Sequence, residues 1–164
     1  MKTNQLTQLD VAILQKWLRL QNNAILVEGF KPEEHTLTIN RFLEYMQTRD
    51  SSLSLNFLEI IEQDHMTLME RLKGVRNLFV YNMDLFGGGI NPDLATQGMK
   101  MLRVAKNEGD ISQLMFARPN ANLDYNSRPG YTYADNHPLG NWCSFYEITD
   151  GELVSESSPI QHRN

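Results

Sequence analysis

The stretch RNLFVYNMDLFGGGINPDL, residues 76–94, separates two parts of the chain that differ in pattern. Its first part is rich in branched and aromatic residues, which predicts a strand within residues 75–85. Glycines occupy positions 87–89, and Asn91 or Asp93 can cap a helix that runs from Pro92 to about Lys106. The stretch therefore marks where a helical first half passes into a second half of strands, one helix and loops.

The three glycines do not match a phosphate-binding loop. A P-loop requires a lysine and a hydroxyl residue directly after its last glycine, whereas Ile90, Asn91 and Pro92 follow here. The third glycine of a dinucleotide-binding GxGxxG loop is also missing at the required spacing. Asp84 and Asp93 flank the triplet and would repel a phosphate. We interpret the glycines as a flexible bend between a strand and a helix.

The first half carries helical periodicity. Apolar residues recur at steps of three and four within residues 6–20, and Thr7 with Asp10 resembles an N-terminal cap. AILVEGF, residues 24–30, is either the end of that helix or a short strand, which we favour. Residues 31–50 form a second predicted helix, since Pro32 suits a first turn. Residues 53–72 predict a single long helix with an apolar stripe that includes His65.

The second half is mixed. ISQLMFARP, residues 111–119, predicts a strand, and CSFYEITDGELV, residues 143–154, predicts a hairpin around Asp150 and Gly151. Between them, residues 118–141 have no regular pattern and form a long irregular loop. We predict an α+β fold in which a helical N-terminal half packs on a small, mostly antiparallel sheet from the C-terminal half. The alternative is a mainly α bundle with an extended C-terminal arm.

Length and composition bound the class of protein. The 164 residues suit one domain, residues 1–164, with 1–73 mainly helical and 74–164 of mixed structure. The formal net charge of -5 and the absence of a dense basic run argue against nucleic-acid binding. A single cysteine, the lack of a signal-peptide pattern and the short apolar runs predict a soluble cytoplasmic protein that has no membrane partner.

Two pairs of residues are candidates for metal, ligand or enzymatic chemistry. Glu62 and His65 have the spacing that brings two side chains to one helix face, but the chain has no second Glu-x-x-His. His137 and Cys143 could form a thiol site, although Cys143 lies between aromatic residues, as a small core residue would. No catalytic residue, metal ligand or cofactor follows from either pair, and an enzyme or a metal- or ligand-binding domain that uses one of them is the alternative function.

The long loop carries the main functional hypothesis. Tyrosine, tryptophan, asparagine and arginine are residues of adaptable recognition surfaces. We therefore predict a non-enzymatic protein-protein interaction or assembly subunit, such as an adaptor, an inhibitor or a component of a virion or secretion machine. Its partners are other protein chains, including copies of itself. The predicted partner-binding residues are Arg118, Tyr125, Arg128, Tyr131, Tyr133 and Trp142.

Overall fold

A single sheet is the centre of the computed structural model, which describes residues 6–19, 24–82, 92–118 and 143–155. Its six strands lie in the order β2-β3-β4-β1-β5-β6. The strands are β1 (Ala24–Glu28), β2 (Ser52–Asn56), β3 (Asn77–Tyr81), β4 (Gln113–Arg118), β5 (Ser144–Thr149) and β6 (Glu152–Ser155). The helices are α1 (Gln8–Arg19), the 3-10 helix η1 (Pro32–Glu34), α2 (His35–Gln47), α3 (Phe57–Glu62), α4 (His65–Leu72) and α5 (Pro92–Glu108).

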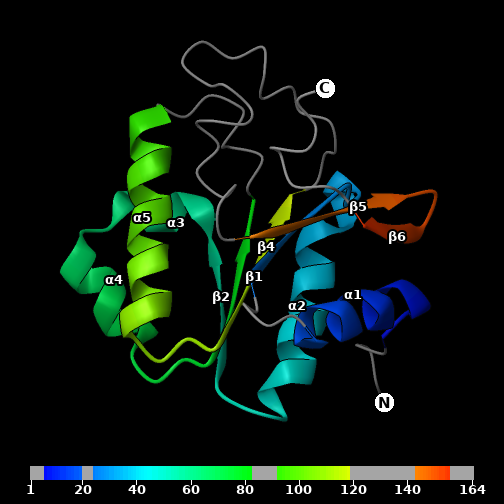
Figure 1. The fold of residues 1–164 in the computed structure, drawn as a ribbon, viewed down its shortest axis with the longest axis horizontal. Helices are drawn as coiled ribbons and strands as arrows, with labels where there is room; N and C mark the ends of the chain where they lie inside the picture. The colour runs from blue at the N-terminus through cyan, green and yellow to red at the C-terminus, as the bar shows by residue number, and fades with distance from the viewer. Residues whose placement is uncertain (1–5, 20–23, 83–91, 119–142, 156–164) are drawn as a thin grey trace.

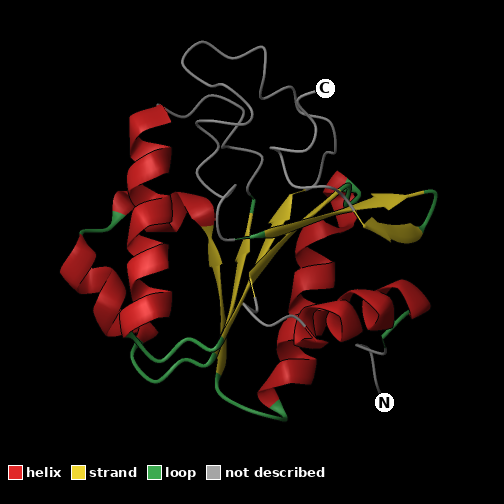
Figure 2. Cartoon of the chain, viewed as in Figure 1, coloured by secondary structure: helices red, strands yellow, loops and turns green. Residues whose placement is uncertain are grey.

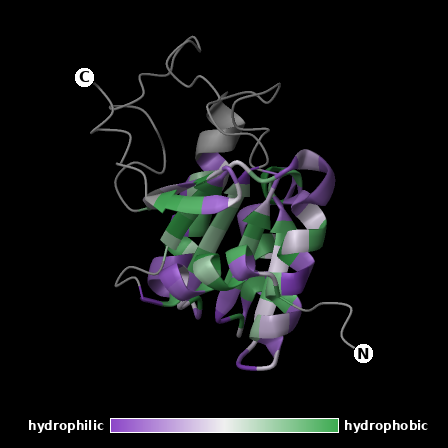
Figure 3. Ribbon diagram, turned by 90° about the vertical axis from the view of Figure 1, so that its right-hand side faces the viewer, coloured by the Kyte–Doolittle hydropathy of each residue, from purple (hydrophilic) through white to green (hydrophobic). Residues whose placement is uncertain are grey.

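Helices cover both faces of this sheet (Figures 1 and 2). α1 and α2 lie on one face, and α3, α4 and α5 lie on the other. Alternate residues of each strand point to opposite helix layers. In β1, Ala24 and Leu26 belong to the core beneath α3, α4 and α5, whereas Ile25 and Val27 belong to the core beneath α1 and α2. The central strands are therefore buried on both faces and are apolar along most of their length (Figure 3).

The mixed sheet with helices packed on it confirms the predicted α+β class and excludes a mainly helical bundle. The expected strand direction was wrong. Four of the five strand pairings are parallel, and only β5 with β6 is antiparallel. The sheet also draws β1 and β2 from the N-terminal half. Uninterrupted apolar runs such as AILV and LMFA are typical of parallel strands covered by helices on both sides, whereas half-exposed antiparallel strands alternate.

The single helix expected over residues 53–72 was also wrong, because three elements occupy that range. β2 takes the alternating sequence SLSLN. Asn56 then begins α3 through a capping box, in which its side chain accepts from the Leu58 amide at 2.9 Å and Glu59 accepts from the Asn56 amide at 3.0 Å. Asp64 caps α4 by accepting from the Thr67 amide at 2.7 Å. These two local caps interrupt the apolar stripe.

Several other expectations are confirmed. β1, β3 and β4 lie within predicted strands, and α1, η1 with α2, and α5 lie at predicted helices. The Thr7 hydroxyl accepts from the Asp10 amide at 3.0 Å, and Asp10 accepts from the Thr7 amide at 3.1 Å, as the cap predicts. Asp150 and Gly151, at φ 51° and 78°, form the turn between β5 and β6. The glycine triplet, within 83–91, joins β3 to α5 and lies outside the described residues.

Among the helices of the described residues, none has the length and hydropathy that crossing a bilayer requires.

Candidate functional site at the carboxyl edge of the sheet

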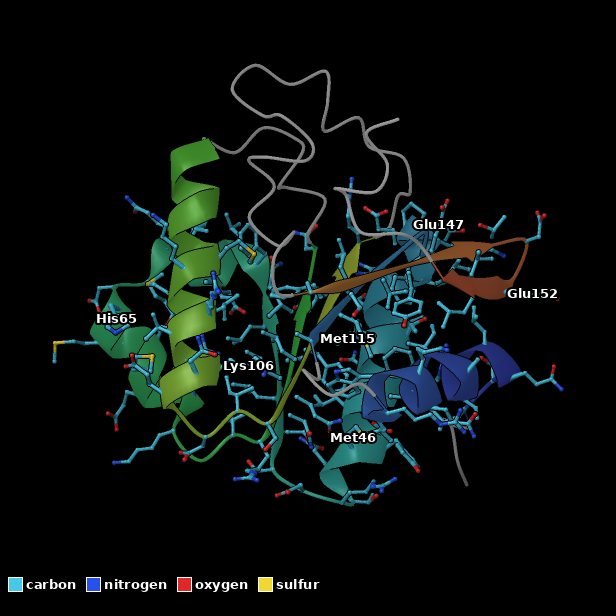
Figure 4. The ribbon with its side chains drawn as sticks, in the orientation of Figure 1. Met46, His65, Lys106, Met115, Glu147 and Glu152 are labelled. Atoms are coloured by element: carbon cyan, nitrogen blue, oxygen red, sulfur yellow. The ribbon has the colours of Figure 1, made fainter. Side chains whose placement is uncertain are left out.

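In β1 and in β4, the only charged residue is the last residue of the strand. Glu28 is the last residue of β1, and Arg118 is the last residue of β4. The Arg118 Nη1 donates to Glu28 Oε2 at 2.6 Å, and the Arg118 side chain has no exposed surface. Glu147 of β5 is the register partner of Glu28 on the other side of β1; Figure 4 labels it. Three neighbouring strands thus place an arginine and two glutamates in one row on the same face.

This row lies at a topological switch point. The connection that leaves β1 through α2 leads to β2, on the far side of β4 and β3. The connection that leaves β4 leads in the opposite direction, across β1 to β5. The two connections therefore leave the adjacent carboxyl ends of β1 and β4 in opposite directions along the sheet. In open sheets of parallel strands, ligands bind in the crevice outside the carboxyl ends at such a point.

Polar side chains also lie at the carboxyl ends of β2 and β3, which are neighbours at one side of the parallel set. Asn56 ends β2, and Asn82 follows β3 with a φ of 64°. The Asn82 Nδ2 donates to Asn56 Oδ1 at 3.2 Å. Beside them, burial raises the pKa of Tyr81, and the charge of Glu59 adds to that rise. The carboxyl edge is therefore polar from β2 to β5.

A cavity opens beside the carboxyl end of β1, on the face that α1 and α2 cover. Its volume is about 430 Å³. The walls come from the start of α1, the turn after β1, the first half of α2 and the β5–β6 hairpin. We call it the β1 cavity; its lining residues are Thr7, Leu9, Asp10, Gly29, Phe30, Lys31, Glu34, Thr38, Arg41, Ile148, Asp150 and Gly151.

The turn after β1 is fixed against the carboxyl end of β4. The amides of Gly29 and Phe30 both donate to the Arg118 carbonyl oxygen, at 3.1 and 3.3 Å. Gly29 has a φ of 97°, a conformation that favours glycine. The same turn then starts η1 and α2, so the β1 cavity and the Glu28–Arg118 ion pair share one short segment of backbone.

One ion pair orders the inner wall of the β1 cavity. Asp10 is buried, and its carboxylate accepts from Arg41 Nε at 2.7 Å and from Arg41 Nη2 at 3.2 Å. Arg41 Nη2 also donates to the Thr38 hydroxyl at 3.2 Å. The hydrogen bond to Asp10 is the main reason that the pKa of Arg41 is raised. Its guanidinium is therefore a permanent cation held in one orientation.

A second cavity, of about 400 Å³, lies between the α3–α4 turn and α5. Its polar lining residues are Gln63, Asp64, His65, Gln97 and Lys100. Gln63 Nε2 donates a hydrogen bond to the Glu59 carbonyl oxygen at 2.9 Å. The lining residues of this cavity belong to α3, α4, α5 and the turn between α3 and α4, and none belongs to a strand, so we regard the β1 cavity as the stronger site.

Of the two predicted chemical pairs, only Glu62 with His65 lies wholly within the described residues. Glu62 ends α3 and His65 begins α4, so the pair does not share a helix face, and His65 is exposed rather than a core residue (Figure 4). No group of three or more His, Cys, Asp or Glu side chains within the described ranges could hold a metal ion. Cys143 is buried in the core, as its aromatic neighbours predicted, and burial raises the pKa of its thiol far above the ordinary value. His137 lies outside the described residues.

The predicted partner-binding residues fall almost entirely outside the described part of the chain. Of the six, only Arg118 is described, and its guanidinium is buried against Glu28 rather than presented at the surface. The partner-binding role of the set stays a prediction. The sequence did hold a signal for the carboxyl edge, which is a single charge directly after an apolar run, as in AILVE and LMFAR.

No protein-family model matches this chain, and a search of the curated proteins finds no match either.

Proposed function

We propose that this protein binds a small molecule in the β1 cavity. The observation that carries the proposal is the place of that cavity, directly beside the carboxyl end of β1, where the adjacent strands β1 and β4 connect in opposite directions. Backbone geometry makes this crevice a recurrent ligand site in sheets of this kind, whatever the chemistry of the protein. The proposal extends no further than binding, and it assigns no reaction.

The size and lining of the β1 cavity support the same function. Its volume of about 430 Å³ falls within the usual range for small-molecule sites. Leu9, Phe30 and Ile148 supply apolar surface, while a fixed guanidinium and several carboxylates supply polar groups. An apolar cavity with a few convergent polar groups is the common composition of a specific site.

A metabolite screen tests this function directly. Binding would be detected by the rise in melting temperature of the intact chain, because a ligand that binds only the folded state at one hundred times its Kd adds about 2.7 kcal/mol of stability. Hits would then be located by amide chemical-shift changes. We expect the changes to centre on residues 29–34 and 148–151.

A matched pair of variants decides whether the β1 cavity is the place of binding. Leu9→Trp enlarges a side chain that lines the cavity, and Leu37→Trp makes the same change on α2, where the side chain is 59% exposed and lines no described cavity. We expect Leu9→Trp to abolish binding and Leu37→Trp to leave it unchanged. Equal binding by both variants, or shifts that centre elsewhere, would refute the proposal.

Docking of protein partners through the segment from Arg118 to Trp142 is the second candidate. It is favoured by the connectivity, because this segment joins β4 to β5 and its two ends therefore flank β1. Light scattering after size-exclusion chromatography and a pull-down would test it. A strictly monomeric protein that loses no partner when the segment is shortened would contradict it.

A further inference from the structure

The strand β2 lies at one end of the sheet and has a free side along its length. It pairs only with β3 (Figure 1). The Asn77 amide donates to the Ser51 carbonyl oxygen at 3.0 Å, so the backbone of Ser51 faces β3. Successive residues of a strand direct their backbone groups to opposite sides. Leu53 therefore also faces β3 with its backbone, whereas the N–H and C=O groups of Ser52 and Ser54 point away from the sheet.

These outward backbone groups are available to a further strand. Among the described residues, none forms a hydrogen bond with the amide or the carbonyl group of Ser52 or Ser54 on that side. Both residues are partly exposed. The next outward amide, that of Asn56, donates to Glu59 Oε1 at 3.0 Å as part of the capping box of α3. The part of the edge that is open to pairing is therefore short and ends before Asn56.

β2 also lacks the features that keep an edge strand from pairing. Natural edge strands commonly carry a charged residue, a proline or a bulge. The sequence of β2 is SLSLN, and its register with β3 continues without interruption from Ser52 to Asn56. The strand at the opposite edge, β6, begins with the charged residue Glu152. Leu58, just after β2, adds an exposed apolar side chain. This edge is therefore suited to contact with another strand.

A second copy of β2 satisfies the outward groups when it runs antiparallel with Leu53 on a two-fold axis. Ser52 then faces Ser54 of the second copy, and Ser54 faces Ser52 of the second copy. In an antiparallel ladder, a hydrogen-bonded pair of this kind exchanges both N–H···O bonds. Leu53 faces its own symmetry mate between the two pairs, at the position where side chains approach most closely. A register centred on Ser54 would instead require the Asn56 amide, which Glu59 already occupies.

The charges at the two ends of β2 favour the same antiparallel arrangement. Before the strand, Asp50 lies 3.9 Å from Arg76, which leaves Arg49 as a cation without an ion pair in the described part of the chain. After the strand, Glu59 and Glu62 are exposed and likewise make no ion pair there. An antiparallel second copy brings the cationic end of each β2 toward the acidic end of the other. A parallel copy would bring like charges together.

From these observations we infer that two copies of this chain associate through their β2 edges and form one continuous sheet across a two-fold axis. The residues that form this contact do not line the β1 cavity, so the inference is independent of the proposed small-molecule function. The open edge is short, and contacts of small area give weak association. We expect a reversible dimer with a Kd in the micromolar range.

Sedimentation equilibrium of the intact chain measures this Kd, and a matched pair of variants locates the contact. Ser54→Pro removes an outward amide that the sheet of one copy does not use, a position at which edge strands accept proline. Ser54→Ala changes the same side chain and keeps the amide. We expect Ser54→Pro to weaken the dimer at least about tenfold, because each dimer loses two N–H donors, and Ser54→Ala to leave it unchanged. Circular dichroism melts would verify that both variants fold.

A disulfide tests the register. Leu53→Cys places two thiols on the axis, at a pair whose Cα atoms are about 4.5 Å apart, which suits a disulfide. The only native cysteine, Cys143, is buried. Oxidised glutathione, which is reduced as the two thiols join, should convert Leu53→Cys into a covalent dimer. Leu37→Cys is the matched control, because Leu37 is exposed on α2 away from β2, and it should cross-link far more slowly.

A charge reversal tests the complementary ends. Arg49→Glu should weaken the dimer by about threefold to tenfold, since each dimer loses two exposed pairs of opposite charges. Arg19→Glu makes the same change in net charge at an exposed residue that ends α1, and it should leave the Kd unchanged.

The results separate the second copy from other occupants of the edge. A chain that stays monomeric at concentrations up to about 1 mM would overturn the inference, and so would a monomeric chain whose β2 edge captures an extended peptide instead. A dimer with the same Kd in Ser54→Pro would place the contact elsewhere and overturn it as well. A dimer that Ser54→Pro weakens but Leu53→Cys does not cross-link would overturn the two-fold register.

Discussion

Gly29 occupies the turn on which both the β1 cavity and the Glu28–Arg118 ion pair depend, and its replacement by alanine should be costly for two separable reasons. Its φ of 97° is a conformation that side chains disfavour. A methyl group there would also meet backbone, because an ideal Cβ lies 2.7 Å from the carbonyl oxygen and 3.2 Å from the amide nitrogen of Ile148. Neither backbone atom can rotate away as a side chain could.

Gly74 separates the two effects. It has a φ of 78°, but a Cβ built on it meets nothing within 4 Å. Gly74→Ala should therefore lower the free energy of unfolding only through the disfavoured backbone conformation. We expect a loss of about 1 kcal/mol once the lower entropy of the unfolded chain is included. Gly29→Ala adds the crowding against Ile148, which by analogy with overpacked cores costs about 1–3 kcal/mol more. The expected loss in the free energy of unfolding is about 2–4 kcal/mol.

Urea denaturation followed by circular dichroism measures both variants against the wild type. The midpoint should shift further for Gly29→Ala than for Gly74→Ala, while the slope with urea stays constant. Equal losses within about 0.5 kcal/mol would refute the close contact between the β1 turn and Ile148. Gly29→Ala should also weaken any ligand of the β1 cavity, since the hairpin that forms one wall must move.

Three further predictions concern the other helix layer and the core. Gly98→Ala should lower the free energy of unfolding by about 1 kcal/mol despite the better helix propensity of alanine, because its Cβ would lie 2.9 Å from Ile61 Cγ2. Adding Ile61→Ala should remove this crowding. A Gly98→Ala variant that is more stable than the wild type would contradict the prediction. The pKa of Asp64 is lowered, chiefly by the Thr67 amide, so its charge stabilises the fold above the ordinary aspartate pKa and this stability is lost as the pH falls through the lower folded value. Asp64→Asn should therefore have a lower free energy of unfolding than the wild type in urea at neutral pH, and this difference should disappear in acid. A difference that does not depend on pH would show that the charge of Asp64 is not its cause. Cys143 should resist a thiol reagent at pH about 8 in the native protein and react in urea, because burial raises its pKa; rapid native labelling would mean that the thiol is accessible.

Local patterns in the sequence predicted most elements, and the failures have physical causes. The caps at Thr7 and Asp10 and the turn at Asp150 and Gly151 were correctly identified, since their interactions involve residues at most three positions apart. Residues 53–72 were misassigned because the alternation of SLSLN is too short to outweigh a helical stripe that continues beyond it. Asn56 and Asp64 were decisive there, but their caps compete with the apolar pattern and become evident only in the structure.

The direction of the strands was predicted wrongly for a different reason. A short apolar run fits a buried strand of either direction, and neighbours in the sheet are decided by packing rather than by propensity. The uninterrupted runs AILV and LMFA could have suggested parallel strands, because two helix layers leave no solvent-facing residues. The order β2-β3-β4-β1-β5-β6 had no comparable local signal.

By itself, the sequence determined most of the helices and strands and the turn at Asp150 and Gly151, because the cap at Thr7 and Asp10 and the hairpin turn are formed by residues that are close in the chain. Only the tertiary structure decided the candidate site. Glu28 and Arg118 are 90 residues apart, and Asp10 and Arg41 are 31 apart. Such pairs meet because β1 and β4 become neighbours and α1 crosses beside α2, and these contacts depend on how the whole apolar surface is buried.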